Sequence, residues 1–253
     1  MSGEVGPAGA DFRGRTLVLT GASGAIGRAV AHQFAQAGAN LVLADLAAQP
    51  LADLAAELAP LGVPVVTRAM DVKSSAENDG LVADAVAAFG AIDFLVPGAG
   101  IYPEQAVRDM TDDQWRRVMA INLDGVFMLI RAAIPHLAPN SSIVNISSVA
   151  GHRGSNRHNH YAATKGALLS MTRGLTWELG DRTRVNAVSP GIIDTPMTTE
   201  LRAQRGDALI AATPLGRHGT PDEVASVIVF LCSPAASFVN GETIQINGGL
   251  HMI

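Results

Sequence analysis

The sequence has a single cysteine, Cys232, among its 253 residues. One thiol can form neither an internal disulfide nor a metal site built from several cysteines, so neither is expected. Charged residues make up only 16% of the chain, and 18 basic side chains stand against 23 acidic ones, for a net charge of −5. Because nucleic-acid-binding proteins usually present a basic surface, this composition predicts no nucleic-acid partner.

The sequence also lacks the signals of membrane insertion and export. No apolar run is expected to reach the length of a membrane span. Residues 1–11 are rich in glycine and alanine and lack the apolar stretch of a signal peptide. We expect a cytoplasmic protein without a membrane partner, in which residues 1–11 form a flexible tail.

Small and aliphatic residues are abundant instead. Hydrophobic residues make up 48% of the chain although aromatic residues make up only 4%. Short runs of Val, Leu and Ile alternate with longer Ala-rich stretches of helical period, and the early runs are continuously apolar, as is typical of parallel strands buried on both faces. This alternation predicts an α/β fold with a doubly wound, Rossmann-like parallel sheet. No break in composition divides residues 12–253, which are expected to form a single domain.

The expected elements cover most of the chain. The last expected helix has a clear start, because Thr220 can act as its N-cap and Pro221 occupies its first turn. The expected strands are 15–20, 40–45, 63–69, 92–97, 142–147, 183–188 and 243–246, and the expected helices are 26–37, 51–59, 74–89, 112–137, 161–179 and 220–231.

A glycine-rich turn, residues 20–27 (TGASGAIG), joins the first expected strand to the first expected helix. Glycines let such a turn close tightly, and backbone N–H groups and the helix dipole favour a pyrophosphate there. An ordinary strand–helix turn is the alternative, but the place at the first strand–helix junction favours dinucleotide binding. The candidate cofactor residues in this turn are Gly21, Ser23, Gly24, Ala25 and Ile26.

The second expected strand ends at Asp45. A carboxylate at this place can accept hydrogen bonds from both hydroxyls of an adenosine ribose and would repel a 2′-phosphate. Ser23 and Leu46 offer no basic side chain to bind such a phosphate. The sequence therefore predicts NAD as the cofactor rather than NADP, although a solvated Asp is also common at strand ends. Asp71 and Val72, at the end of the third strand, are candidates to border the adenine.

Tyr161 and Lys165 lie four residues apart, which places them on one face of a helix. An ammonium group beside a phenol favours the phenolate, so we expect the pKa of Tyr161 to be lowered from its usual value of about 10. Ser148 ends a strand, and the strand ends carry the ligand sites of doubly wound sheets. These three residues are the expected catalytic set.

At this point the sequence resembles the short-chain dehydrogenase/reductase family, in its single-domain branch, from residue 12 to the C-terminus. The resemblance implies an oxidoreductase in which Ser148 binds the substrate oxygen, Tyr161 exchanges the alcohol proton and Lys165 holds the nicotinamide ribose. Asn122 would bind, through its backbone, a water that links Lys165 to solvent. The matching features are the turn 20–27, Asn122, Ser148, Tyr161 with Lys165, the segment 190–195 (PGIIDT) and the turn 247–249 (NGG).

The resemblance also implies further cofactor contacts, and the sequence departs from the family pattern in two places. Ala25 stands where the family has Gly, and residues 97–100 read Pro-Gly-Ala-Gly where the family has Asn-Asn-Ala-Gly, so that Pro97 supplies no N–H. We expect cofactor binding to survive both changes. The implied cofactor residues are Gly98, Ala99, Gly100, Tyr161, Lys165, Pro190, Gly191, Ile193 and Thr195.

Residues 152–160 (HRGSNRHNH) correspond to the substrate-side loop of the family. Arg153, Arg157 and His158 are candidate substrate residues, because Arg suits a carboxylate or phosphate and His titrates near pH 6.5, so anion affinity should improve toward pH 6. A merely solvated loop is the alternative. No carboxylate accompanies His158 and His160, so no metal site is expected. Residues 194–213 look like the family's mobile lid, although a plain pair of surface helices fits equally well.

The expected helix 161–179 has apolar or small residues on more than one side, which predicts burial on two faces. The resemblance suggests that this helix meets a second copy of the chain, together with residues 112–137, in a homodimer or homotetramer. Burial by the chain's own loops is the alternative.

Three functions remain open. The first is an NAD-dependent oxidoreductase that interconverts a small secondary alcohol, of polyol, sugar or hydroxy acid type, and its ketone. The second is a 3-oxoacyl thioester reductase, which Asp45 disfavours indirectly because reductive biosynthesis usually draws on NADPH. The third is a catalytically silent NAD-binding regulator, which the intact set of Ser148, Tyr161 and Lys165 disfavours.

Overall fold

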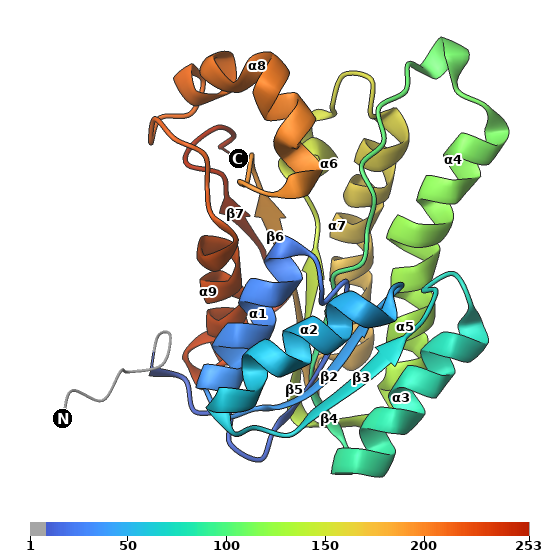
Figure 1. Ribbon diagram of the computed structural model, residues 1–253, viewed down its shortest axis with the longest axis vertical. Coiled ribbons are helices and arrows are strands. Elements are labelled where there is room, and N and C mark those ends of the chain that lie inside the picture. Colours follow the sequence, from blue (N-terminus) through green and yellow to red (C-terminus); the bar gives the residue numbers. More distant parts are fainter. Residues whose placement is uncertain (1–8, 253) are drawn as a thin grey trace.

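The computed structural model describes residues 9–252, so most of the expected tail, residues 1–8, lies outside the described residues. Seven parallel strands form one sheet in the order β3-β2-β1-β4-β5-β6-β7 (Figure 1). The order reverses between β1 and β4, and ligands of such sheets bind beyond the carboxyl ends of the strands at this reversal. The strands are β1 (Thr16–Thr20), β2 (Asn40–Asp45), β3 (Val65–Ala69), β4 (Ile92–Pro97), β5 (Leu137–Ile146), β6 (Thr183–Pro190) and β7 (Thr243–Ile246).

Helices cover both faces of the sheet, which confirms the predicted doubly wound α/β fold. On one face, α1 (Ala25–Gln36), α2 (Ala48–Leu58) and α9 (Pro221–Cys232) share an apolar core with the sheet. On the other face lie α3 (Ser75–Phe89), α5 (Gly125–Ala133) and α7 (Asn159–Leu179). The first core is centred on three buried phenylalanine rings, Phe12, Phe34 and Phe94, with centroids 4.5 to 5.4 Å apart. Phe12 thereby joins the start of the expected domain to the sheet.

The single helix expected over 112–137 is divided. It consists of α4 (Asp112–Met119), a π-helical turn η4 (Ala120–Asp124), α5 and a short 3₁₀ turn, η5 (Ile134–His136), and β5 then begins at Leu137. The π turn places Asn122 at the buried inner side, where its amide bonds the backbone of Ile101 in both directions, at 2.9 Å each. Such turns often mark functional sites.

Within the described residues, one stretch bears on the expectation that no apolar run reaches the length of a membrane span. The continuous helical segment Asp112–His136 contains an 18-residue window of mean hydropathy 1.6, which is long and apolar enough by length and composition alone. In the folded chain, however, Val126, Leu129 and Ile130 of α5 are buried in the core on the face of the sheet that α3, α5 and α7 cover. Their apolar character therefore has an explanation within the folded chain.

Two further helices complete the fold near the carboxyl ends of the strands. Helix α6 (Val149–Arg153) follows β5 directly, and its N-cap is Ser148, whose hydroxyl accepts the Ala150 N–H at 3.1 Å. Helix α8 (Thr199–Ala211) follows the 3₁₀ turn η6 (Pro196–Thr198) and lies above β6 and β7 in Figure 1. Both helices border the region where the strands end, and α6 had not been expected from the sequence.

Candidate active site

Two adjoining cavities open at the carboxyl ends of the strands. The first is a cleft of about 580 Å³ around the reversal between β1 and β4. It brings together most of the residues that the sequence predicted for cofactor binding, namely Gly21, Ser23, Gly24, Ala25, Ile26, Asp45, Asp71, Val72, Gly98, Ala99, Gly100 and Thr195. Its lining also includes residues that the sequence reading missed, namely Gly27, Leu46, Met70, Ile101, Ile121, Pro196 and Met197.

The glycine-rich turn has two positions that only glycine can occupy. Gly21 has a φ of +68°, and a Cβ there would lie 2.7 Å from the backbone of Gly98 and Ala99. A Cβ on Gly27 would lie 2.1 Å from the Gly21 carbonyl oxygen. The departure at Ala25 falls between them, where Ala25 is simply the first residue of α1 after its N-cap, Gly24. The backbone of the turn is therefore free to approach a pyrophosphate.

Residues 97–100 at the end of β4 are held in place although they lack the two Asn side chains of the family pattern. Pro97 pairs in register with Thr20 as the last residue of β4. Gly98 donates its N–H to the Thr20 carbonyl at 3.1 Å, and Ala99 donates to the Thr20 hydroxyl at 3.4 Å. A Cβ on Gly98 would lie only 2.7 Å from the Thr20 carbonyl oxygen, so at this separation of the two strand ends only glycine fits at position 98.

Asp45 lies at the edge of the cleft with its carboxylate already oriented. Its Oδ2 accepts the Ser23 N–H at 3.0 Å and the Ser23 hydroxyl at 2.5 Å, and its Oδ1 accepts the Leu46 N–H at 2.7 Å. A carboxylate has about four lone-pair positions, so acceptor capacity remains for a ligand hydroxyl.

Two of the expected catalytic residues line the second cavity. Ser148 follows β5 by two residues, and Tyr161 lies in the first turn of α7. Lys165 lies one turn further along α7, almost fully buried, and its Nζ donates to the Ile146 carbonyl at 2.7 Å. Gly151 lets α6 pack closely on this part of α7, because a Cβ there would lie 2.7 Å from the Lys165 backbone.

The pKa of Tyr161 departs from the sequence-based expectation. Burial raises it to about 12, and the hydrogen bond with Ser148 only partly offsets this effect. Burial also lowers the pKa of Lys165 to about 8. The Lys165 ammonium is 5.5 Å from the centre of the Tyr161 ring, so its attraction does not outweigh desolvation in the protein alone.

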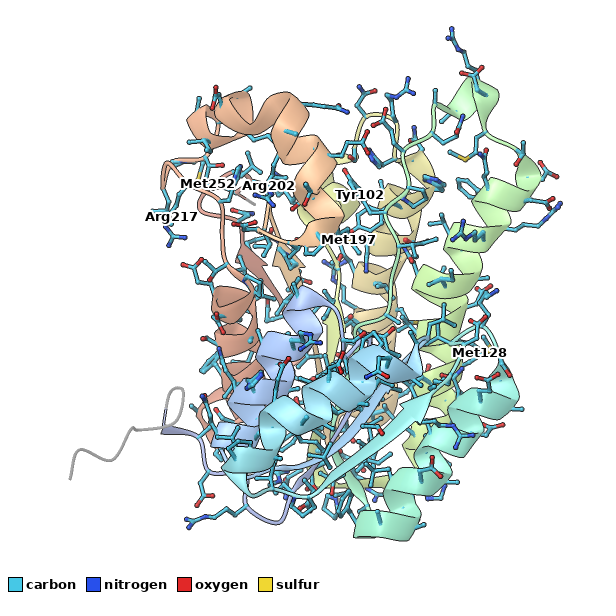
Figure 2. The ribbon with its side chains drawn as sticks, viewed as in Figure 1. Tyr102, Met128, Met197, Arg202, Arg217 and Met252 are labelled. Carbon is cyan, nitrogen blue, oxygen red and sulfur yellow. The ribbon has the colours of Figure 1, made fainter. Side chains whose placement is uncertain are left out.

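The second cavity, of about 400 Å³, is bounded by α6, the start of α7 and α8. Tyr102 forms one wall that the sequence reading missed, since it follows the cofactor segment 98–100 without any motif (Figure 2). Its ring stacks on His158 at 3.9 Å and meets Tyr161 edge-on at 4.6 Å. Apolar side chains also line this cavity, among them Met197, Leu201 and Leu209. The cavity therefore offers both polar and apolar surface to a substrate.

The loop between Ser148 and Tyr161 separates its two arginines. Arg153 lines the second cavity and makes no ion pair with any residue in the range 9–252. Arg157 is absent from this lining and instead pairs with Glu104. This pairing argues against the substrate role expected for Arg157. His158 lines the cavity, but its Nδ1 donates to the Asn156 carbonyl at 2.8 Å.

The expected titration of the loop histidines near pH 6.5 is not supported. Burial lowers the pKa of His152, His158 and His160. At a given pH a smaller fraction of these side chains is protonated than of a free imidazole, so any gain of anion affinity on their protonation would move to lower pH.

The segment 190–195 contributes to both cavities. Gly191 lines the second cavity, and its N–H donates to the Ile246 carbonyl at 2.9 Å. Pro190 and Ile193, which were also expected to contact the cofactor, are buried and line neither cavity. Beyond them, Met197 borders both cavities (Figure 2). Arg202 of α8 pairs with Asp194 at 2.6 Å. The region 194–213 thus contributes lining residues to both cavities, and whether it moves as a lid stays a prediction.

The fold and this site define a class of proteins, the dinucleotide-binding oxidoreductases with a parallel, doubly wound sheet. Comparison with known proteins is more specific. A family model described as "Enoyl-(Acyl carrier protein) reductase" matches residues 21–251. The chain belongs to the short-chain dehydrogenase/reductase family, as the sequence motifs predicted.

Individual relatives carry different names. The chain is 38% identical over 242 residues to the 3-oxoacyl-[acyl-carrier-protein] reductase FabG of Thermotoga maritima, covering 94% of this chain and 98% of that protein. It is 35% identical over 240 residues to the meso-2,3-butanediol dehydrogenase of Serratia marcescens, covering 94% and 95%. A solved structure titled as a short-chain dehydrogenase/reductase, glucose/ribitol dehydrogenase, from Brucella melitensis is 53% identical, with a TM-score of 0.93 over 96% of this chain and 99% of that one.

Proposed function

We propose that this oxidoreductase uses NAD to interconvert a small secondary alcohol, of polyol, sugar or hydroxy acid type, and its ketone. The observation that carries the proposal is that two neighbouring cavities hold the two parts of the site. The cleft with Asp45 and the second cavity, which Ser148 and Tyr161 line, share Met197 in their linings. A nicotinamide cofactor in the cleft would supply the hydride chemistry.

The chain's own residues account for the proton. The Ser148 hydroxyl holds the substrate oxygen near the Tyr161 hydroxyl, which takes the alcohol proton during oxidation and returns it during reduction. Lys165 is anchored by the Ile146 carbonyl and supplies a positive charge that favours the Tyr161 phenolate. Burial opposes this phenolate in the protein alone, so the positive charge of Lys165 acts against the cost of desolvation.

The preference for NAD rests on Asp45. Its carboxylate is fixed at the edge of the cleft by Ser23 and Leu46 and can accept hydrogen bonds from ribose hydroxyls. A 2′-phosphate at the same place would meet this negative charge.

A 3-oxoacyl thioester reductase is the second candidate, favoured by the printed names of relatives such as the Thermotoga maritima protein. A substrate panel decides between the two. Vicinal diols, polyols and hydroxy acids with NAD are compared with a 3-oxoacyl thioester and NADH or NADPH, by NADH or NADPH absorbance. Turnover of the alcohols with NAD supports the proposal, and efficient turnover of the thioester alone would replace it. Binding of NAD without turnover of either class would favour the regulator.

A first prediction concerns Arg153, the cation in the second cavity. If the substrate carries a carboxylate, Arg153→Ala should raise KM by about one to two decades, since a hydrogen bond to a charged group contributes about 1.5–3 kcal/mol. Arg157→Ala is the matched control, and it should leave KM unchanged because Arg157 pairs with Glu104 outside the cavity. KM is measured for an anionic substrate and a neutral analogue. An equal response of both substrates to Arg153→Ala would exclude anion recognition and favour a neutral polyol.

A second prediction concerns assembly into a homodimer or homotetramer. The inner face of α7 is buried at Leu168 and Thr172, whereas its outer face is exposed in the single chain at Ala163, Gly174 and Trp177. Trp177 is 91% exposed, which is unusual for so large an apolar side chain. We propose that a second copy covers this face together with α4 and α5.

Ala163→Glu should therefore shift the protein toward monomer. Gly166 of the same helix is unsuitable for this test, because a Cβ there would lie 3.2 Å from the Gly151 carbonyl oxygen of α6. As a control, Ala56→Glu introduces the same charge at an exposed position of α2. The mass of the assembly in solution should then remain that of the wild type. The mass is measured by light scattering at micromolar concentration, and a monomeric wild-type protein would refute the assembly.

A further inference from the structure

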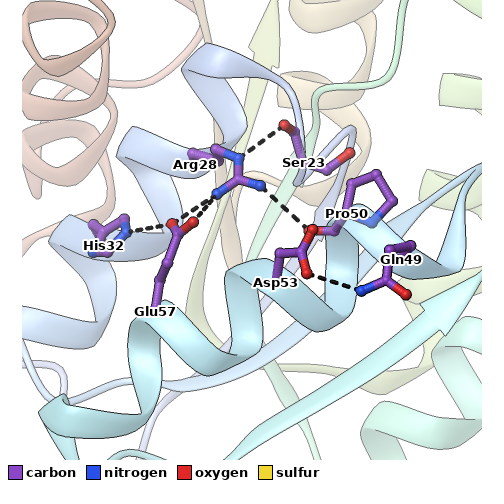
Figure 3. Close-up of polar contacts among 7 residues, drawn as sticks. All are labelled: Ser23, Arg28, His32, Gln49, Pro50, Asp53 and Glu57. Atoms are coloured by element: carbon purple, nitrogen blue, oxygen red, sulfur yellow. Dashed lines mark hydrogen bonds and ion pairs between the residues drawn. The ribbon is translucent and has the colours of Figure 1, made fainter.

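Arg28 of α1 lies behind the glycine-rich turn and contacts it directly (Figure 3). Its Nε donates to the Ser23 carbonyl at 3.2 Å. Its Nη1 donates to both carboxylate oxygens of Glu57, at 2.6 Å each, and its Nη2 donates to the Pro50 carbonyl at 3.4 Å. One side chain of α1 is thus tied at once to the turn and to two positions of α2.

These contacts fix the peptide that joins Ser23 to Gly24. Arg28 holds the carbonyl of this peptide, and the Gly24 N–H on its other side donates to the Gly21 carbonyl at 3.2 Å. A peptide group held at both its donor and its acceptor cannot rotate without breaking one of the two bonds. The orientation of Ser23 is therefore set largely from behind the turn.

Ser23 in turn orients Asp45. Its N–H and its hydroxyl both donate to the same carboxylate oxygen of Asp45, at 3.0 and 2.5 Å. Arg28 is consequently connected to the carboxylate at the edge of the cleft through a single residue, although it does not line the cleft itself.

The ion pair that holds Arg28 is partly exposed, with 30% of the Arg28 side chain and 47% of the Glu57 side chain accessible. Exposed pairs of this kind contribute little to the free energy of folding. The geometry of this pair can still hold Arg28 so that its Nε donates to the Ser23 carbonyl. His32, from the next turn of α1, lies 3.5 Å from Glu57 and adds a further contact to the same carboxylate.

We propose that Arg28 is a positioning residue for the adenosine-ribose subsite, acting through Ser23 on Asp45. The inference rests on the proposed function, in which NAD places its adenosine ribose at Asp45. Arg28 does not contact the ligand, and its effect appears as the direction in which the Asp45 carboxylate points.

The test is a double-mutant cycle read by NAD affinity in the absence of substrate. Kd is measured by calorimetry for the wild type, Arg28→Met, Asp45→Ala and the double variant. Arg28→Met should weaken NAD binding by roughly 2- to 12-fold, the range that corresponds to one hydrogen bond. In the Asp45→Ala background, Arg28→Met should weaken NAD binding by less than about two-fold, because the carboxylate through which Arg28 acts is gone.

Two further variants separate positioning from folding. Asp53→Asn alters another polar contact of α2, the pair with Gln49 at 2.9 Å, which does not touch Arg28 and should leave Kd unchanged (Figure 3). Glu57→Gln keeps Arg28 but removes its ion pair, and it should weaken NAD binding in the same direction by a smaller factor. This variant carries the test if Arg28→Met does not fold. The kcat at saturating NAD should remain that of the wild type in both Arg28→Met and Glu57→Gln.

Each outcome is decisive. Wild-type NAD affinity in both Arg28→Met and Glu57→Gln would overturn the inference, and so would an equal loss in both backgrounds, which would indicate general damage to the turn. Asp45→Ala with wild-type NAD affinity would instead overturn the placement of the ribose in the proposed function, and the inference with it. A loss in Asp45→Ala without a loss in either Arg28→Met or Glu57→Gln would leave the proposed function standing and remove only the role of Arg28.

Discussion

Replacing Tyr161 with Phe is expected to lower kcat by about 10²–10⁴-fold while NAD still binds. The substitution removes only the hydroxyl that exchanges the substrate proton. The ring keeps its edge-on contact with Tyr102 at 4.6 Å, so the walls of the cavity should persist. Turnover is measured with the substrate found in the panel, and NAD affinity is measured separately by calorimetry.

Tyr102→Phe is the matched control for this experiment. It removes the other tyrosine hydroxyl of the cavity, which contacts the Ser155 hydroxyl at 3.2 Å rather than Ser148. We expect less than about a tenfold change in kcat, since this hydroxyl has no part in the proposed proton transfer. If Tyr161→Phe retained most of the wild-type kcat, or if Tyr102→Phe lost as much, Tyr161 would not be the acid/base.

The pH dependence of the wild-type rates tests the same assignment of Tyr161 as the acid/base. Oxidation requires the Tyr161 phenolate, and burial raises the pKa of this group to about 12 in the protein alone. Oxidation should therefore accelerate as the pH rises from 6 to 10, because the deprotonated fraction grows while the pH remains below the pKa. Ketone reduction, which requires the protonated phenol, should show no such rise. An oxidation rate independent of pH would contradict the assignment.

The second large effect is expected at Asp45. The wild type should prefer NAD over NADP by a wide margin in kcat/KM, and Asp45→Ala should lower kcat/KM for NAD by roughly 10-fold or more. The reason is the loss of hydrogen bonds between a carboxylate and ribose hydroxyls, which contribute about 1.5–3 kcal/mol each. The same variant should accept NADP better, because the repelling charge is gone.

Asp71→Asn controls for the removal of a negative charge from the same cleft. Asp71 already pairs with Lys73 at 3.2 Å, and its neutralisation should leave the preference for NAD in place. The kcat/KM values for both cofactors are compared across the wild type and the two variants. Equal use of NAD and NADP by the wild type would refute the role of Asp45.

Much of the fold could be predicted because its signals are local. The apolar runs 40–45, 92–97 and 243–246 are strands with the predicted bounds, and the capping pattern that begins at Thr220 starts α9 where expected. Each of these signals depends on neighbouring residues, whose side-chain period and turn chemistry are visible in the sequence. The family followed from motifs in order along the chain, and the comparisons confirmed it.

The division of the segment 112–137 depends on contacts that the sequence does not display. Its apolar pattern continues through residues 120–124, but Asn122 bonds the backbone of Ile101, 21 residues away, within a π turn. The helix α6 escaped prediction for a similar reason, because its five residues are too few for a periodic signal.

The sequence by itself determined the parallel α/β fold, the glycine-rich turn and the residue types at the candidate site, because these follow from local pattern and motif spacing. Only the tertiary structure separated Arg153 in the cavity from Arg157 beside Glu104, four residues away in the same loop. It also placed Arg28 behind Ser23 and reversed the expected direction of the Tyr161 pKa shift. Burial and the direction of a side chain depend on the packing of distant segments, and a linear pattern contains neither.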